Sequence, residues 1–381
     1  MRAARADVDL GAVAHNIRVL ADHVAPAELC AVVKADGYGH GAIAVGQAAL
    51  EAGAGWLAVA LIEEGAVLRK AGISAPILLL SQPRIDDFDM AVHYDLSLAV
   101  YTREGIEAAA DAATANGQPA RVHLKVNTGM NRVGAHPDQV VELAQLIAKR
   151  PQLVLEGIWT HCAVADEPDN GFTAIQLERF DEINARLDEL GLHPTMRHAA
   201  NSAAAIHHPG ARHDLVRCGI AIYGIAPSPA LAGLVPLRPA LTLRAEVAMV
   251  KRVGAGEGIS YGLRHRVSAP TTIVTVPIGY ADGVPRRLSA VGGHVLIKGR
   301  RHPIVGSVTM DQLMVDVGDL DVNVGDEVVL IGEQADADGT VARITAEDWA
   351  VPLDTIAYEI VCGIGPRVPR FYRRAHPQQQ P

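Results

Sequence analysis

The first 225 or so residues alternate short apolar runs with amphipathic segments of helical period. We expect eight strands, at residues 30–33, 56–60, 76–80, 96–100, 121–126, 154–159, 195–198 and 214–216. Helices are expected between them, at residues 43–52, 63–71, 104–115, 138–149 and 173–190. Strict alternation predicts a parallel sheet covered by helices. Periodicity alone does not distinguish an open, doubly wound sheet from a closed one, but the count of eight favours a TIM-like (β/α)8 barrel.

A proline-rich stretch ends this alternation. Residues 226–239 hold four prolines and few helix signals, which indicates a linker. The β-branched runs that follow, at residues 241–253, 271–276, 294–297, 312–317 and 327–331, are joined by Gly and Asp turns and predict a mostly antiparallel β domain. We therefore expect an α/β chain with a barrel domain over residues 1–228, a β domain over residues 238–373 and a disordered tail over residues 374–381.

Charge and cysteine usage narrow the class of protein. With 34 Lys and Arg residues against 43 Asp and Glu residues the net charge is −9, and no basic run is longer than a short pair such as Arg286-Arg287. We therefore expect neither nucleic acid nor an anionic membrane as the main partner. Four scattered cysteines without C-x-x-C spacing, and a charged start without an apolar h-region, predict a cytoplasmic protein. His207, His208 and His213 lack a helical i, i+4 pair, so we expect no metal site.

Lys34 ends the first expected barrel strand. Residues 31–33 are apolar, and a turn rich in glycine follows the lysine. Catalytic side chains of β/α barrels lie at this carboxyl end of the strands. A lysine desolvated by its neighbours loses its proton more easily and can form a Schiff base. A structural lysine that extends its amine to solvent at a strand end is the alternative.

The same run resembles a known family. A-V-V-K-A-D-G-Y-G-H-G, at residues 31–41, is similar to the cofactor-lysine motif of bacterial alanine racemases. Further blocks that resemble this family are H-L-K-V-N-T-G-M-N-R at 123–132, H-A-A-N-S at 198–202, V-R-C-G-I-A-I-Y-G at 216–224, G-I-S-Y-G at 258–262, P-I-G-Y-A-D-G at 277–283, G-S-V-T-M-D-Q at 306–312 and A-Y-E-I…G-P-R-V-P-R at 357–370. The eight blocks follow one another in order over nearly the whole chain, which makes the resemblance specific.

The resemblance implies an alanine racemase that uses pyridoxal 5′-phosphate (PLP) and interconverts L- and D-alanine, supplying D-alanine for peptidoglycan. It implies that Lys34 is the Schiff-base lysine and one of two bases. The second base would be Tyr261 of the partner subunit, so a homodimer with composite active sites is expected. Arg217 would face the pyridine nitrogen and, as a permanent cation, keep it unprotonated. His161 would link Arg217 to Tyr261.

Other roles are implied in the same way. Residues expected at the cofactor phosphate are Tyr38, Asn201, Ser202, Gly219, Ile220 and Tyr358. The loops after the last two barrel strands and the N-terminus of a following helix are also where β/α barrels commonly bind phosphate. Arg132 and the backbone amide of Met310 would bind the substrate carboxylate, and Tyr280 and Asp311 would line the entry. Lys125 matches a lysine that is often carbamylated. Asn127 stands where many members carry Asp, and Asn131 where Gly or His is common.

Three other functions stay open. A racemase of the same fold could prefer serine, lysine or arginine. A PLP-binding regulatory protein without turnover would resemble the barrel alone, so the second domain with Tyr261 counts against it. A PLP decarboxylase of related fold usually carries a catalytic cysteine where this chain has Thr309.

Overall fold

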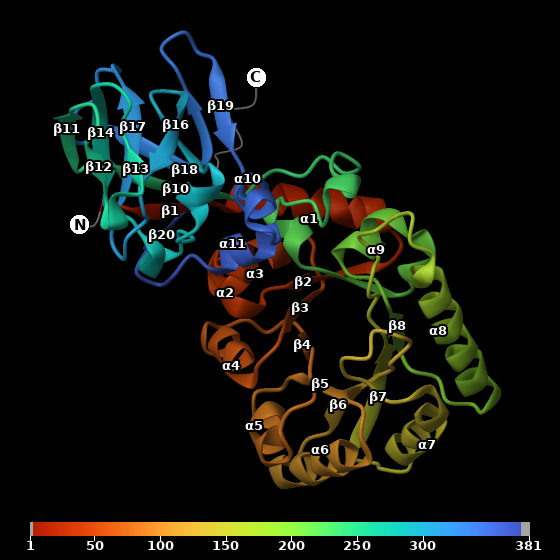
Figure 1. The fold of residues 1–381 in the computed structure, drawn as a ribbon. Helices are drawn as coiled ribbons and strands as arrows, with labels where there is room; N and C mark the ends of the chain where they lie inside the picture. The colour runs from red at the N-terminus through yellow and green to blue at the C-terminus, as the bar shows by residue number, and fades with distance from the viewer. Residues whose placement is uncertain (1–2, 375–381) are drawn as a thin grey trace. The chain divides into compact units, whose positions relative to one another are not determined.

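A computed structural model of the chain describes residues 3–374, and it divides into two compact units (Figure 1). The barrel unit comprises Gly11–Gly37 and Ala42–Pro239. The β unit comprises the first residues up to Leu10, the short segment Tyr38–Gly41, and the chain from Ala240 onward. The expected disordered tail, residues 374–381, lies outside the described residues apart from Arg374. None of the helices within residues 3–374 is long and apolar enough to cross a bilayer.

The barrel unit is built on eight parallel strands. They are β2 (Glu28–Val32), β3 (Trp56–Val59), β4 (Ile77–Leu79), β5 (Ser97–Val100), β6 (Ala120–Lys125), β7 (Leu153–Trp159), β8 (Met196–His198) and β9 (Leu215–Cys218), in the order β9-β2-β3-β4-β5-β6-β7-β8. The two ends of this order meet, because Asp214 N donates to Arg197 O and Arg217 N donates to Ala200 O, both at 3.0 Å. The prediction of an eight-stranded, barrel-like sheet is confirmed.

Helices alternate with these strands: α1 (Leu10–Val24), α2 (Lys34–Tyr38), α3 (Ala42–Glu51), α4 (Ile62–Lys70), α5 (Phe88–His93), α6 (Arg103–Asn116), α7 (Pro137–Ala148), α8 (Phe172–Glu189) and α9 (Ser202–His207). Local sequence explains their ends. The Thr102 side chain accepts from Gly105 N at the start of α6, and Gly117 ends that helix at φ +64°, a left-handed conformation that glycine adopts readily. The buried face of α6 consists mainly of alanines and Ile106. The short helix α5 and the N-terminal α1 were not among the expected helices.

The β unit is mostly antiparallel. Its main sheet runs β11-β14-β17-β16-β15-β18-β10-β1-β20, with β19 beside β18, and β12 and β13 form a separate pair. The bounds are β1 (Arg5–Asp9), β10 (Leu241–Glu246), β11 (Met249–Val253), β12 (Gly258–Ile259), β13 (His265–Arg266), β14 (Thr271–Val276), β15 (His294–Ile297), β16 (Arg300–Val305), β17 (Leu313–Gly318), β18 (Glu327–Ala335), β19 (Val341–Ile344) and β20 (Arg370–Arg373). Two helices, α10 (Ala346–Ala350) and α11 (Ala357–Cys362), follow β19.

The first strand departs from the expected domain bounds. The sequence placed residues 1–228 in the barrel domain, but β1 pairs antiparallel with β10 and parallel with β20. Within β1, Ala6 and Val8 are buried, and the buried Asp7 carboxylate lies 3.0 Å from Arg244 Nε. β1 was not predicted from the sequence, because charged residues alternate with apolar ones along it and no apolar run marks the strand. Arg5 also pairs with Asp7, at 3.2 Å, but Arg244 lies more than 200 residues away in the chain.

Candidate functional site

The turn after Lys34 is left-handed. Ala35, Asp36 and Gly37, inside α2, have φ values of 52°, 49° and 62°. For the two residues that carry a Cβ, this conformation costs roughly 1–2 kcal/mol each. Backbone strain of this kind clusters at functional sites, where the surrounding structure holds it in place. The turn therefore marks the end of β2 as a site whose geometry is imposed by its neighbours.

Glu64 supplies much of that restraint. Its Oε1 accepts from Ala35 N at 2.6 Å, and its Oε2 accepts from Ala60 N and Leu61 N at 2.8 and 3.1 Å. Asp36 Oδ1 accepts from Ala42 N at 2.9 Å and closes the turn from the other side. No local pattern marks Glu64 beyond its place in the first turn of a helix, because its contact with Ala35 depends on the β2–β3 pairing.

Cationic side chains converge near the carboxyl ends of the barrel strands. Lys125 is buried at the end of β6, and burial, then the charges of three other cations, lower its pKa to about 7. Those cations are Arg217, Arg132 and Lys34. Burial and the same three residues, together with Lys125, hold the pKa of the half-buried His161 well below its usual value. The charges that act on Lys125 are all positive, so this part of the barrel fits an anionic ligand such as a phosphate-bearing cofactor.

Trp159 forms a platform for two of these cations. Its ring centre lies 4.1 Å from Lys125 Nζ and 4.6 Å from Arg217 Cζ. The His198 ring stacks on it at 5.5 Å, with 7° between the planes. A tryptophan face attracts cations electrostatically, and more strongly where water is excluded. Trp159 ends the strand expected at residues 154–159, and no role was expected for it.

Arg217, on β9, is 3% exposed and held by neutral acceptors. Its Nη2 donates to Thr160 O at 2.8 Å and to Ala199 O at 3.0 Å, and its Nη1 donates to His198 Nδ1 at 2.7 Å. His161 Nδ1 lies 3.4 Å from Nη2, so the expected neighbours Arg217 and His161 do lie together. Burial lowers the pKa of Arg217 to about 10, which leaves it charged at neutral pH.

The loops after β8 and β9 meet at Ser202. Its Oγ accepts from Gly219 N at 2.8 Å and from Ala221 N at 3.5 Å. Asn201 is the N-cap of α9, and its Oδ1 accepts from Ala204 N at 3.0 Å. Ile220 follows Gly219 directly and begins a 3-10 turn. Backbone amides and a hydroxyl gathered in this way can bind phosphate oxygens.

Arg132 lies on the loop between β6 and α7 and is exposed. Asn127 folds this loop: its Oδ1 accepts from Gly129 N at 3.2 Å and from Asn131 N at 3.0 Å. Its Nδ2 donates to Asn131 Oδ1 at 2.9 Å, and Asn131 adopts a left-handed φ of 56°. The two positions at which the sequence departs from the family pattern therefore support one another directly.

The β unit carries the remaining expected residues. Tyr261, in a turn after β12, is 76% exposed, and Met310 is 52% exposed. Ser307 ties these two loops together, since its Oγ donates to Tyr261 O at 3.1 Å and its carbonyl accepts from Ser260 Oγ at 2.7 Å. Large side chains this exposed suit a surface that another chain covers.

Tyr280 and Asp311 lie on two loops that pair with one another. Tyr280 N donates to Thr309 O at 3.0 Å, and Ala281 N donates to Met310 O at 3.1 Å. Arg367 Nη2 donates to Asp311 Oδ1 at 2.5 Å. The expected entry residues Tyr280 and Asp311 therefore lie on loops that meet beside Met310, which was expected to bind the substrate carboxylate. Elsewhere in this unit the rings of Tyr38 and Tyr358 approach to 6.2 Å.

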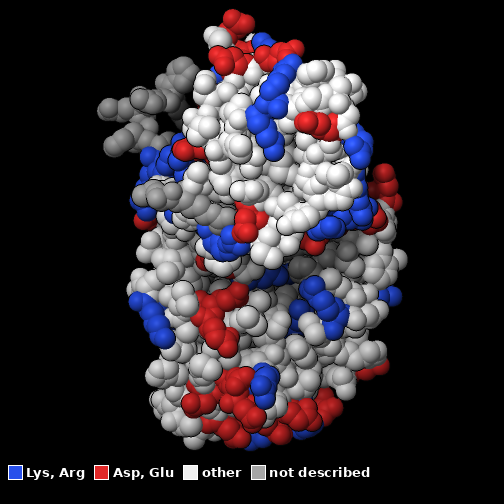
Figure 2. Space-filling view, turned by 60° about the vertical axis from the view of Figure 1, so that its left-hand side comes forward, with Lys and Arg blue, Asp and Glu red and all other residues white. Residues whose placement is uncertain are grey.

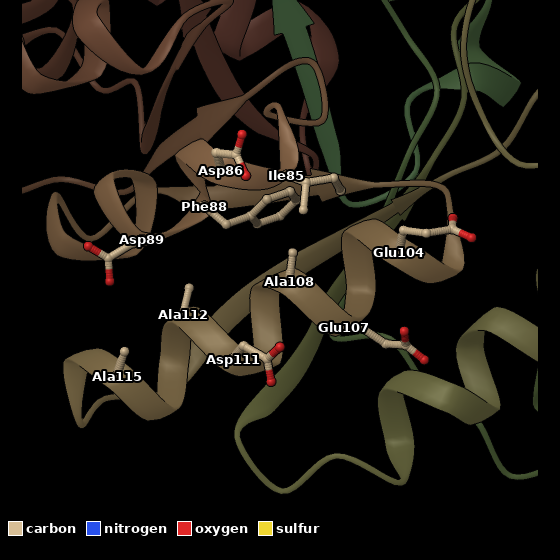
Figure 3. A pocket seen from close by; sticks show the side chains of 10 residues that line it. All are labelled: Ile85, Asp86, Phe88, Asp89, Glu104, Glu107, Ala108, Asp111, Ala112 and Ala115. Carbon is tan, nitrogen blue, oxygen red and sulfur yellow. The ribbon is translucent and has the colours of Figure 1, made fainter.

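A groove elsewhere in the barrel unit contains none of these residues. It has a volume of about 490 Å³ and lies between α6 and the segment that contains α5 (Figure 3). Its apolar floor includes Phe88 and Ala112, and its acidic rim consists of Asp86, Asp89, Glu104, Glu107 and Asp111. Figure 2 shows Asp and Glu side chains gathered toward the lower end of the view. Within residues 3–374, no group of three or more His, Cys, Asp or Glu side chains could hold a metal ion.

Comparisons with known proteins agree with this geometry. Two sequence profiles match: alanine racemase, N-terminal domain, over residues 8–227, and alanine racemase, C-terminal domain, over residues 240–372. An alanine racemase from Symbiobacterium thermophilum is 50% identical over 98% of this chain and 97% of its own length.

Two solved structures are similar. The alanine racemase of a D-cycloserine-producing Streptomyces lavendulae has a TM-score of 0.91 at 41% identity and covers 99% of this chain and 98% of its own. The alanine racemase of Bacillus anthracis with bound L-Ala-P has a TM-score of 0.91 at 39% identity and covers 98% and 96%. Profiles over both parts of the chain and full-length relatives point the same way: the chain belongs to the alanine racemase family.

Proposed function

We propose that this chain interconverts L-alanine and D-alanine with PLP held by Lys34. The observation that carries the proposal is the group of cations Lys34, Arg132 and Arg217 around the Lys125 amine, which fits an anionic cofactor and a carboxylate substrate. PLP, when bound, supplies an electron sink that makes the α-proton of an amino acid removable. The L-Ala-P bound in the Bacillus anthracis relative supports an alanine-like substrate.

Two bases would move the proton. The Lys34 amine takes or returns it on one face of the substrate, and Tyr261 of the partner subunit serves the opposite face. A phenolate needs positive charge nearby, and Arg217 through His161 provides it. The high exposure of Tyr261 and Met310 supports a homodimer in which each chain completes the other's site.

Other side chains would bind and orient. Arg217 would contact the cofactor's pyridine nitrogen and would stay charged there, since its pKa of about 10 lies well above neutral pH. Residues assigned to the cofactor phosphate are Tyr38, Asn201, Ser202, Gly219, Ile220 and Tyr358. Arg132 and the Met310 amide would bind the substrate carboxylate, while Tyr280 and Asp311 would restrict the entry.

Lys125 would carry a carbamate. A lysine with a pKa of about 7 is partly neutral at pH 7, and a neutral amine adds to CO2 with loss of one proton. The resulting carbamate is negative, so it converts a repulsive neighbour of Arg132 into an attractive one.

The test is direct. Purified protein is incubated with PLP and L-alanine, and D-alanine is detected with a D-amino-acid oxidase. We expect D-alanine to form, and Lys34→Ala to abolish both its formation and the visible absorption of bound PLP. Protein that binds PLP but forms no D-alanine contradicts the proposal and favours a regulatory PLP-binding protein. Faster turnover of serine, lysine or arginine favours a broader racemase. Cytoplasmic supply of D-alanine for peptidoglycan follows from the activity and is tested by rescue of a bacterium that requires D-alanine.

A further inference from the structure

A hydrogen-bonded chain crosses the barrel interior from Arg217 to a carboxylate. Arg217 Nη1 lies 2.7 Å from His198 Nδ1, and His198 Nε2 lies 2.8 Å from His123 Nδ1. His123 Nε2 lies 2.9 Å from Glu156 Oε2, which also accepts from Ser97 Oγ at 2.6 Å. Both histidines and Ser97 are fully buried.

The Glu156 carboxylate determines which atom donates and which accepts in every hydrogen bond between it and Arg217. Ionised Glu156 can only accept, so His123 must carry its proton on Nε2 and expose a lone pair on Nδ1. His198 must then donate through Nε2, which leaves its Nδ1 as the acceptor. A guanidinium can only donate, so this Nδ1 lone pair is what Arg217 requires.

The protonation states agree with this direction. Burial lowers the pKa of His123, with Glu156 opposing it only in part, and burial and the Arg217 charge hold the pKa of His198 well below its usual value. Both imidazoles are therefore neutral at pH 7. Burial alone would raise the pKa of Glu156, but hydrogen bonds from His123 and Ser97, together with the charge of Arg121 at 3.6 Å, outweigh it and hold that pKa below its usual value.

Two local features place Glu156 in the barrel. Val122 pairs with Leu155 and His123 pairs with Gly157, so Glu156 is an extra residue in β7. A bulge of this kind re-aims a side chain and is often found beside an active site. Gly157 makes room for the imidazole, since a Cβ there would lie 2.3 Å from His123 Nδ1.

We propose that Glu156 is a positioning residue for Arg217, acting through His123 and His198 by fixing both imidazoles as Nε2–H tautomers. The proposal rests on the proposed function only where it links Arg217 to racemisation. Without the carboxylate, His123 is free to place its proton on Nδ1, where it opposes the His198 Nε2 proton. His198 then loses the lone pair that holds the Arg217 guanidinium.

Two pairs of variants of the PLP-loaded enzyme test the hydrogen-bonded chain from Glu156 to Arg217. Glu156→Gln keeps an oxygen that accepts from His123, whereas Glu156→Met removes it. His123→Gln can accept from His198 and donate to Glu156 through one amide, whereas His123→Leu can do neither. Glu178→Met, on the exposed side of α8, is the control for loss of a carboxylate. Imidazole ¹⁵N shifts of labelled histidine report the tautomers, and kcat and KM for alanine report the reaction.

We expect Nε2–H tautomers for His123 and His198 in the wild type and for His198 in both glutamine variants. In Glu156→Met and His123→Leu, His198 should populate Nδ1–H, and kcat should fall roughly 10- to 100-fold with little change in KM, because a displaced Arg217 misorients the site. If Glu156→Met does not fold, the comparison of His123→Gln with His123→Leu tests the proposal.

An unchanged His198 tautomer in the methionine or leucine variant overturns the proposal, as does a tautomer change that leaves kcat intact. Equal loss of activity in the glutamine and apolar variants also contradicts it. If the wild type has the expected tautomers but forms no D-alanine, the proposed function fails instead.

Discussion

Lys125 Nζ lies 4.1 Å above the centre of the Trp159 indole ring, inside the barrel and beside other cations. An indole face attracts an ammonium ion, but it does not replace the water that burial removes. Burial is the main reason that the pKa of Lys125 falls from 10.5 to about 7. Because it is buried, Lys125 destabilises the fold when it is protonated and is a reactive amine when it is neutral.

The stability of the cofactor-free protein should therefore depend on Lys125. The folded pKa is about 7 and the unfolded value 10.5, so the unfolded state binds more protons between these two pH values. The free energy of unfolding should rise with pH through that window. Lys125→Met removes the titration, so the variant should be the more stable protein at pH 6, and its advantage should shrink toward pH 10. Urea unfolding in CO2-free buffer measures both proteins, and a pH-independent difference contradicts the assignment.

Glu64 should matter for the turn after Lys34. Glu64→Ala leaves the amides of Ala35, Ala60 and Leu61 without their acceptor, which should cost roughly 1–3 kcal/mol of unfolding free energy. The loosened turn should also weaken PLP binding, measured by titrating cofactor-free protein with PLP. Glu64→Gln retains one oxygen and should lie between the wild type and Glu64→Ala. Equal PLP affinity in all three proteins would show that Glu64 does not hold this turn.

The sequence predicted the strands of the barrel well, because their signal is local. Each of the eight expected strands lies within three residues of an observed one, and the cationic residues Lys34, Lys125 and Arg217 fall at or near strand ends, as the alternation indicates. The catalytic assignments came from the resemblance of short motifs to a family rather than from periodicity.

What the sequence did not predict depends on long-range register. Glu156 looks like one more residue of a strand, and only the pairing of β6 with β7 reveals it as a bulge. β16 contains two arginines and Pro303, which conceal its strand character. The partners of Glu156 are remote in the chain, whereas β16 pairs with the neighbouring β15 and is concealed by its composition alone.

Gly157 offers a test of the barrel packing. A Cβ at this position would lie 2.3 Å from His123 Nδ1, and His123 is fully buried, so it has little space into which to move. Gly157→Ala should cost roughly 1–3 kcal/mol of unfolding free energy, as overpacking does. Gly171→Ala is the matched control, since nothing lies within 4 Å of its Cβ and its φ of −66° suits alanine. Equal stability of the two variants would show that the barrel accommodates the methyl group.

The origin of Tyr261 can be tested with two inactive variants. If each active site combines Lys34 of one chain with Tyr261 of the partner subunit, a mixed dimer of Lys34→Ala and Tyr261→Phe chains contains one site in which both residues are intact. Random pairing of equal amounts makes half of the dimers mixed, so roughly a quarter of wild-type activity should return. Differently tagged chains produced together and purified through both tags would give dimers with about half the wild-type activity.

The separate variants are the controls, because neither alone should form D-alanine. Tyr261→Phe should still show the visible absorption of bound PLP, because Lys34 is intact in that variant. Activity in Tyr261→Phe alone would exclude the phenol as a base. Inactive mixed dimers that bind PLP would place both residues of each site on one chain, since in that arrangement every site of a mixed dimer lacks either Lys34 or Tyr261.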